Sequence, residues 1–155
     1  MKMTYDEWRV KHQNEVNALP IFFAFSNKQF EKELGKRGLT MENLDQVRKV
    51  AGGFCLAKDV PVIRAFLDKP DELPELMKDA EFAEGAFYSE MCNHEFGINW
   101  QGAWDVCRCF GDPEYCEGKS GAEYLEEMGY GAETIEAWGH AKSRYYKAAE
   151  DGEWF

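Results

Sequence analysis

The densest group of residue types that could do chemistry is the sequence Asn93-His94-Glu95, with Asp105 further along the chain. A histidine and a carboxylate can serve as general base and general acid. Because adjacent residues of a helix point to different parts of its surface, His94 and Glu95 would need a third group to act together. A small metal-dependent or acid–base enzyme that uses His94, Glu95 and Asp105 is therefore one alternative function. We assign no catalytic residue and expect a binding protein rather than an enzyme.

His94 also continues an apolar helical stripe formed by Ala83, Phe87 and Met91. A histidine on such a face is usually buried and hydrogen-bonded to a carbonyl or a carboxylate. We therefore expect His94 to be a buried residue with a structural role first.

Thiol and imidazole groups, the ligands that zinc prefers, lie close together in the second half of the chain. They are Cys92, His94, Cys107, Cys109, Cys116 and His140. Structural zinc sites commonly pair ligands separated by two to four residues, whereas Cys107 and Cys109 would point about 200° apart on a helix. From these spacings we expect no metal site, no cofactor and no stoichiometric zinc.

Charge is distributed unequally along the chain. Residues 1–67 contain 11 basic and 8 acidic side chains, whereas residues 68–155 contain 7 basic and 21 acidic ones, within a net charge of −11. So negative a surface repels nucleic acid and anionic membranes and attracts basic protein surfaces. We expect an acidic protein-binding module that mimics nucleic acid and occupies a basic surface of another protein, with no direct nucleic-acid or membrane binding.

The carboxylates expected to bind the partner fall in two segments. They are Asp71, Glu72, Glu75, Asp79, Glu81 and Glu84 in the first, and Glu123, Glu126, Glu127, Glu133 and Glu136 in the second. A structural or regulatory homo-oligomer, with no electrostatic role for these residues, is a further alternative.

The chain has the composition of a packed domain. Hydrophobic residues make up 45% and aromatic residues 15% of its 155 residues, too many for a disordered acidic tail. We predict a single globular domain, 1–155, basic-leaning over 1–67 and strongly acidic over 68–155. The sequence shows no signal-peptide pattern and no apolar stretch long enough for a bilayer, so we expect a cytoplasmic protein with reduced cysteines.

Hydrophobic spacing and capping patterns predict an α+β fold that is mainly helical, with about six helices around a minor two-stranded antiparallel ribbon. The expected helices cover residues 4–19, 27–36, 40 to 47 or 50, a segment after 59, 75–96, 122–128, and a last segment through Ile135, Trp138 and Tyr145. Two short apolar runs, 21–25 and 54–57, are expected to pair in the ribbon.

After Asn93-His94-Glu95 come an aromatic residue, Phe96, and then Ile98-Asn99. Together with residues 19–25 and 145–150, this motif resembles a family of uncharacterised proteins encoded by bacteriophages and other mobile elements. The resemblance implies a mobile-element origin, where small acidic inhibitors of host defence enzymes are common, and a place in the host-cell cytoplasm. The motif residues, whose role is unknown, are Asn93, His94, Glu95, Asn99 and Asp105.

Overall fold

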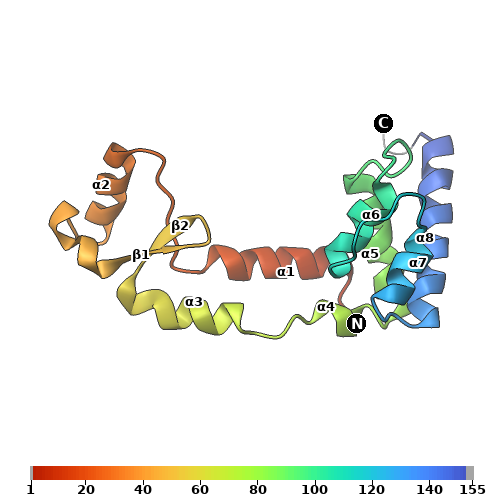
Figure 1. Cartoon of the computed structure of the whole chain (residues 1–155), viewed down its shortest axis with the longest axis horizontal. Coiled ribbons are helices and arrows are strands. Elements are labelled where there is room, and N and C mark those ends of the chain that lie inside the picture. Colours follow the sequence, from red (N-terminus) through yellow and green to blue (C-terminus); the bar gives the residue numbers. More distant parts are fainter. Residues whose placement is uncertain (1, 153–155) are drawn as a thin grey trace. The chain divides into compact units, whose positions relative to one another are not determined.

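The computed structural model describes residues 2–152 of the chain. It is mainly helical with a two-stranded antiparallel sheet (Figure 1), which confirms the predicted fold class. The chain forms two compact units: the insert unit, Gln13–Pro70, and the acidic unit, Met1–His12 with Asp71–Phe155. The acidic unit carries nine basic and 22 acidic residues, a net charge of −13. That the two units form one domain remains a prediction.

The insert unit contains short helices and one hairpin. The elements are α2 (Asn27–Lys36), η1 (Met41–Gln46), β1 (Val47–Val50), β2 (Gly53–Leu56), η2 (Ala57–Asp59) and α3 (Val60–Leu67). The helix predicted from residue 40 is the 3-10 helix η1, which ends at Gln46. Its predicted extension to residue 50 is wrong, because Val47–Val50 form β1. Ala51 and Gly52 both have positive φ angles, as the tight two-residue turn between β1 and β2 requires.

The predicted partner of the second apolar run is also wrong. β2 pairs with β1, and residues 21–25 contribute only an isolated bridge in which the backbones of Phe22 and Phe54 exchange two hydrogen bonds of 2.8 Å. A Cβ atom on Gly53 would lie 2.7 Å from the carbonyl oxygen of Phe22, so glycine permits this approach. Phe22 then packs with Leu34 and Leu56 in the small core of this unit.

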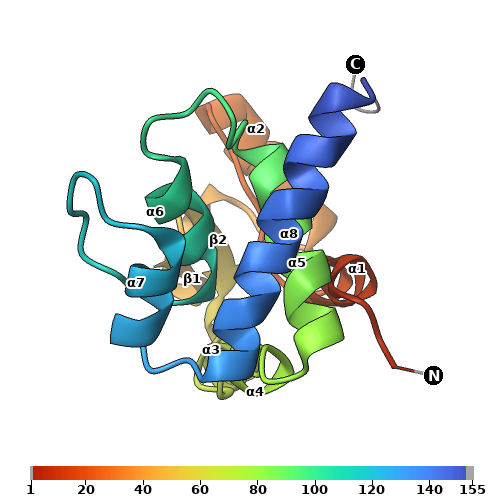
Figure 2. The ribbon, with the colours of Figure 1, turned by 90° about the vertical axis from the view of Figure 1, so that its right-hand side faces the viewer.

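The acidic unit is built on two long helices. Its elements are the start of α1 (Tyr5–Asn17), α4 (Leu73–Leu76), α5 (Ala80–Asn93), α6 (Gly102–Cys107), η3 (Arg108–Phe110), α7 (Gly121–Glu127) and α8 (Ala132–Glu150). Helix α5 packs along α8 (Figure 2). The expected helix 75–96 is divided in two, because Asp79 caps a new helix by accepting a hydrogen bond from the Phe82 amide.

Aromatic rings fill the core of the acidic unit. Phe87 of α5 contacts Trp138 of α8 and Phe110 of η3 in edge-to-face geometry, with ring centroids 5.2 Å apart in both pairs. Thr134 is buried and donates a hydrogen bond to the carbonyl of Met77, so its hydroxyl is satisfied. Within residues 2–152, none of the helices combines the length and the apolar character needed to span a membrane.

Candidate functional site

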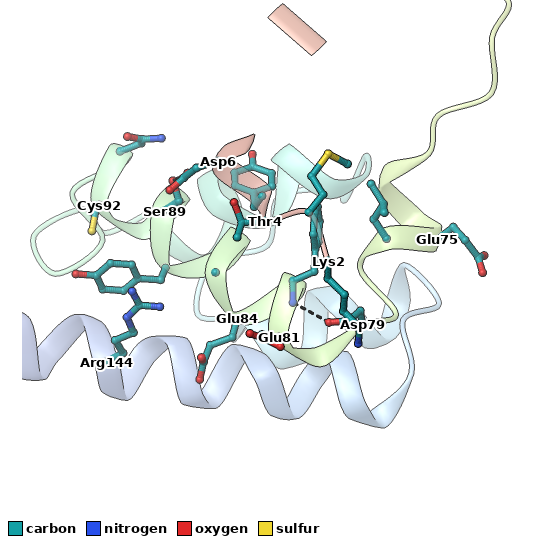
Figure 3. A pocket seen from close by; sticks show the side chains of 17 residues that line it. Lys2, Thr4, Asp6, Glu75, Asp79, Glu81, Glu84, Ser89, Cys92 and Arg144 are labelled. Atoms are coloured by element: carbon teal, nitrogen blue, oxygen red, sulfur yellow. Dashed lines mark hydrogen bonds and ion pairs between the residues drawn. The ribbon is translucent and has the colours of Figure 1, made fainter. Parts of the chain in front are cut away.

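A groove of about 770 Å³ opens on the acidic unit between the N-terminal residues 2–6 and one side of α5 (Figure 3). Its charged lining is mostly acidic: it has five carboxylates, Asp6, Glu75, Asp79, Glu81 and Glu84, and two basic groups, Lys2 and Arg144. Four of the carboxylates predicted to bind a partner are thus brought to one concave surface.

Two contacts fix the edges of this groove. Lys2 donates a hydrogen bond of 2.6 Å to Asp79, which holds the N-terminal residues against the start of α5. This contact and the hydrogen bond from the Phe82 amide lower the pKa of Asp79 below its usual value. The guanidinium of Arg144 lies 4.0 Å from the ring centroid of Tyr88, an arrangement in which the cation is attracted to the aromatic face.

Other carboxylates of the first predicted segment have local structural roles. Asp71 accepts a hydrogen bond from the Leu73 amide at the start of α4. Glu72 accepts one of 2.7 Å from the indole of Trp8. These two residues therefore stabilise the fold, and the structure does not place them in the groove lining.

The second predicted segment is divided between two places. Glu136 of α8 and Glu84 of α5 approach the two ring nitrogens of His140, at 3.8 and 3.9 Å, so Glu136 lies next to the groove. On α7, Glu123 forms a capping box with Ser120. Helix α7 lies on one flank of α8, and the N-terminal residues lie on the other (Figure 2). The carboxylates of α7, which include Glu126 and Glu127, are thus separate from the groove.

The Asn-His-Glu motif forms the end of α5. His94 is the C-cap, and Glu95 follows with φ of 51°. The amide of Phe96 donates to the Met91 carbonyl and that of Glu95 to the Cys92 carbonyl, which is the hydrogen-bond pattern of a Schellman motif. The helix therefore ends at Asn93, so that His94 is its C-cap and not a further residue of the buried stripe.

The expectation that His94 is buried is consequently wrong, because its side chain remains 35% exposed at the helix end. Glu95 is exposed on the turn. Asp105 accepts a hydrogen bond from the Asn99 amide at 2.8 Å, and the same amide donates to the His94 carbonyl. Asn99 and Asp105 thus brace the turn after α5, and the proposed enzyme trio does not converge on one point.

A different group does converge. The Nε2 atom of His94 lies 3.4 Å from Glu90 Oε2 and 3.6 Å from Cys109 Sγ, and Cys109 Sγ lies 3.2 Å from the same Glu90 oxygen. Glu90 is buried, whereas His94 and Cys109 are partly exposed. Glu90 is not among the site residues predicted from the sequence, although its spacing of four residues from His94 places both on one helix face.

The other oxygen of Glu90 accepts two hydrogen bonds and lies near a guanidinium group. Tyr5 Oη and Asn93 Nδ2 each donate to Oε1 at 3.1 Å, and Arg9 Nη1 lies 3.4 Å from it. Burial, together with the Glu90 carboxylate, raises the pKa of Tyr5, so its phenol stays protonated and can donate.

This cluster is not arranged as a cysteine nucleophile with its base. In such a site the carboxylate orients the histidine through the nitrogen that does not face the thiol. Here Glu90 Oε2 and Cys109 Sγ face the same nitrogen of His94. Burial and the nearby Glu90 carboxylate raise the pKa of Cys109 to about 12, which opposes thiolate formation.

The chain belongs to a family of unknown function (DUF7659), whose model matches residues 4–102. The match includes α5 and the Asn-His-Glu motif as far as Asn99, and it ends before Asp105 and Cys109. No curated protein and no solved structure matches the chain.

Proposed function

We propose that this protein is an acidic protein-binding module that holds a basic segment of another protein in the groove beside α5. The observation that supports this most is the gathering of Asp6, Glu81 and Glu84 on one concave surface. A groove of about 770 Å³ is the size of a binding site for a few side chains of a partner.

The charge of the acidic unit adds a long-range contribution. A net charge of −13 attracts a basic partner before contact and raises its association rate, an effect that salt screens over about 10 Å at 0.1 M. Within the groove, Lys2 neutralises Asp79 and Lys78 pairs with Glu75 at 2.7 Å. Asp6 accepts a hydrogen bond of 3.0 Å from the neutral Ser89 hydroxyl, and Glu84 lies 3.9 Å from His140 Nδ1. These two carboxylates and Glu81 are the ones that would pair with a lysine or an arginine of the partner.

More specifically, the natural partner is a protein with a nucleic-acid-binding surface. Carboxylates on a convex or grooved surface compete with phosphates for the same lysines and arginines. In a protein from a mobile element, such a surface would inhibit a defence enzyme of the host cell. This origin comes from the motif resemblance, and the family match itself carries no assigned function.

The test compares two double variants that each remove two charges. Glu81→Gln with Glu84→Gln alters the groove, and Glu31→Gln with Glu42→Gln alters exposed positions of the insert unit. The probe is a short labelled arginine-rich peptide, titrated by fluorescence anisotropy at two salt concentrations. We expect the groove variant to bind more weakly and with a smaller salt dependence, and the matched control to bind like the wild type.

Equal weakening in both variants would show a diffuse effect of net charge and would contradict the groove proposal. A third variant, Glu126→Gln with Glu133→Gln, tests whether the second predicted segment takes part. Sedimentation distinguishes the homo-oligomer alternative from the protein-binding module. The homo-oligomer alternative predicts that the wild-type chain associates with itself and that both charge variants still do so.

A further inference from the structure

The geometry points to a zinc-binding site formed by Glu90 Oε2, His94 Nε2 and Cys109 Sγ in the acidic unit. Glu90 is in the last turn of α5, His94 is the C-cap of this helix, and Cys109 is in η3. The inference is independent of the proposed groove and departs from the expectation of no metal that the cysteine spacings suggested.

The three ligand atoms have the separations that a tetrahedral zinc ion requires. Zinc binds oxygen and nitrogen at about 2.0 Å and sulfur at about 2.3 Å, so tetrahedral ligands lie about 3.3 to 3.6 Å from one another. The observed separations are 3.2 Å for oxygen and sulfur, 3.4 Å for oxygen and nitrogen, and 3.6 Å for nitrogen and sulfur. One ion can therefore contact all three atoms with shifts of a few tenths of an ångström.

The surrounding hydrogen bonds orient the carboxylate for this purpose. Tyr5 and Asn93 donate to Oε1, and Arg9 lies near the same oxygen, which leaves Oε2 directed at His94 and Cys109. Partners of this kind fix the direction of a metal ligand and are part of a binding site.

The backbone also favours a cation here. His94 caps the C-terminus of α5, where the helix dipole places partial negative charge. Glu90 adds a buried negative charge. When zinc is bound by one carboxylate, one thiolate and one neutral imidazole, the charges of the ion and its ligands cancel, which suits a partly buried position.

Binding replaces water molecules of the hydrated ion with the three side chains. The Zn–S bond forms as the S–H bond of Cys109 breaks, and the proton leaves to solvent, so one proton is released for each zinc bound. His94 binds through the Nε2 lone pair with its proton on Nδ1. Three protein ligands leave the fourth tetrahedral position for a water molecule, and the partial exposure of His94 and Cys109 gives solvent access to the site.

The test is titration of the full chain with Zn²⁺ against a chromophoric chelator, with elemental analysis of protein purified without chelator. We expect about one zinc per chain in the wild type and in Cys116→Ser, a matched thiol change at an exposed position outside the cluster. Cys109→Ser and His94→Gln should each weaken binding by more than about 100-fold, since changes to outer partners alone cost about 10- to 100-fold. Tyr5→Phe, which removes one such partner, should weaken it about 10- to 100-fold.

Far-UV circular dichroism checks that each variant is folded. Serine can still donate a hydrogen bond to Glu90, so Cys109→Ser should keep the fold. If Cys109→Ser does not fold, His94→Gln tests the zinc site independently. Absence of zinc binding by the wild type would overturn the proposal. Equal binding by the folded wild type, Cys109→Ser and His94→Gln would overturn it as well.

Discussion

Asn99 and Asp105 are joined by a hydrogen bond of 2.8 Å from the Asn99 amide to Asp105 Oδ2. The same amide donates to the His94 carbonyl, and Asn99 Oδ1 accepts from the backbone of Gln101. The Asn99 side chain thus connects the end of α5 to the start of α6, which gives this residue of the motif a structural role.

Asn99→Ala should therefore destabilise the protein by about 1–3 kcal/mol, because three hydrogen bonds are lost and partly buried polar groups are left unpaired. The measurement is urea unfolding followed by circular dichroism. Asn14→Ala, at an exposed position of α1, is the control and should change stability by less than about 0.5 kcal/mol. Equal midpoints for the two variants would contradict the bracing role of Asn99.

Glu95→Gly should leave stability unchanged or raise it by up to about 1 kcal/mol. Glu95 occupies the C′ position of the Schellman motif with φ of 51°, a conformation that glycine adopts without steric cost. Thermal melting measures the effect. A large loss of stability would instead show that the Glu95 side chain makes a contact important for the fold.

Gly121→Ala should destabilise the acidic unit by about 1–3 kcal/mol through overpacking. A Cβ atom at this position would lie 2.1 Å from the Trp138 ring, which is fixed in the core. Gly139→Ala is the matched control, because its Cβ meets no atom within 4 Å and α8 should gain up to about 1 kcal/mol of helix propensity. We expect chemical denaturation to show changes in the unfolding free energy of opposite sign for the two variants. Changes of the same sign would contradict the packing argument.

Leu34→Ala tests whether the two units unfold together. It removes a fully buried side chain from the small core of the insert unit, at a cost of about 2–5 kcal/mol. We expect amides of α2, β1 and β2 to exchange faster while those of α5 and α8 stay protected, as measured by hydrogen exchange with mass spectrometry. Loss of protection in α5 and α8 to the same extent would support the single-domain prediction.

Asp79→Asn should reduce the loss of stability at acidic pH. The Lys2 contact lowers the pKa of Asp79 in the folded state, so its stabilisation is complete above the ordinary value of about 4 and is lost as pH falls through the lower folded-state pKa. Asparagine keeps a cap acceptor but cannot titrate. Unfolding free energies measured from neutral to acidic pH should therefore fall less steeply in this variant. Lys2→Gln should also reduce the fall of the unfolding free energy with falling pH. An unchanged pH dependence in both variants would contradict the assignment of this effect to the Lys2–Asp79 contact.

Local patterns in the sequence determined most of the secondary structure. Ser26, Asp79 and Ser120 cap helices through short-range hydrogen bonds, and the periodic apolar residues of α8 place Trp138 and Tyr145 in the core. Such signals are readable because the interacting groups lie within a few residues of one another. The pairing of β1 with β2 also has a local cause, which is the two-residue turn at Ala51-Gly52. A helix predicted as far as residue 50 covers β1 and therefore does not predict this hairpin.

Only the tertiary structure decided which distant residues meet. Glu90 and His94 share a helix face in the sequence, but Cys109 reaches them because η3 packs against the end of α5. The groove likewise needs Lys2 to lie against Asp79, 77 residues away. Contacts of this range depend on how core side chains pack, so spacing along the chain predicts the types of functional residues but not their convergence.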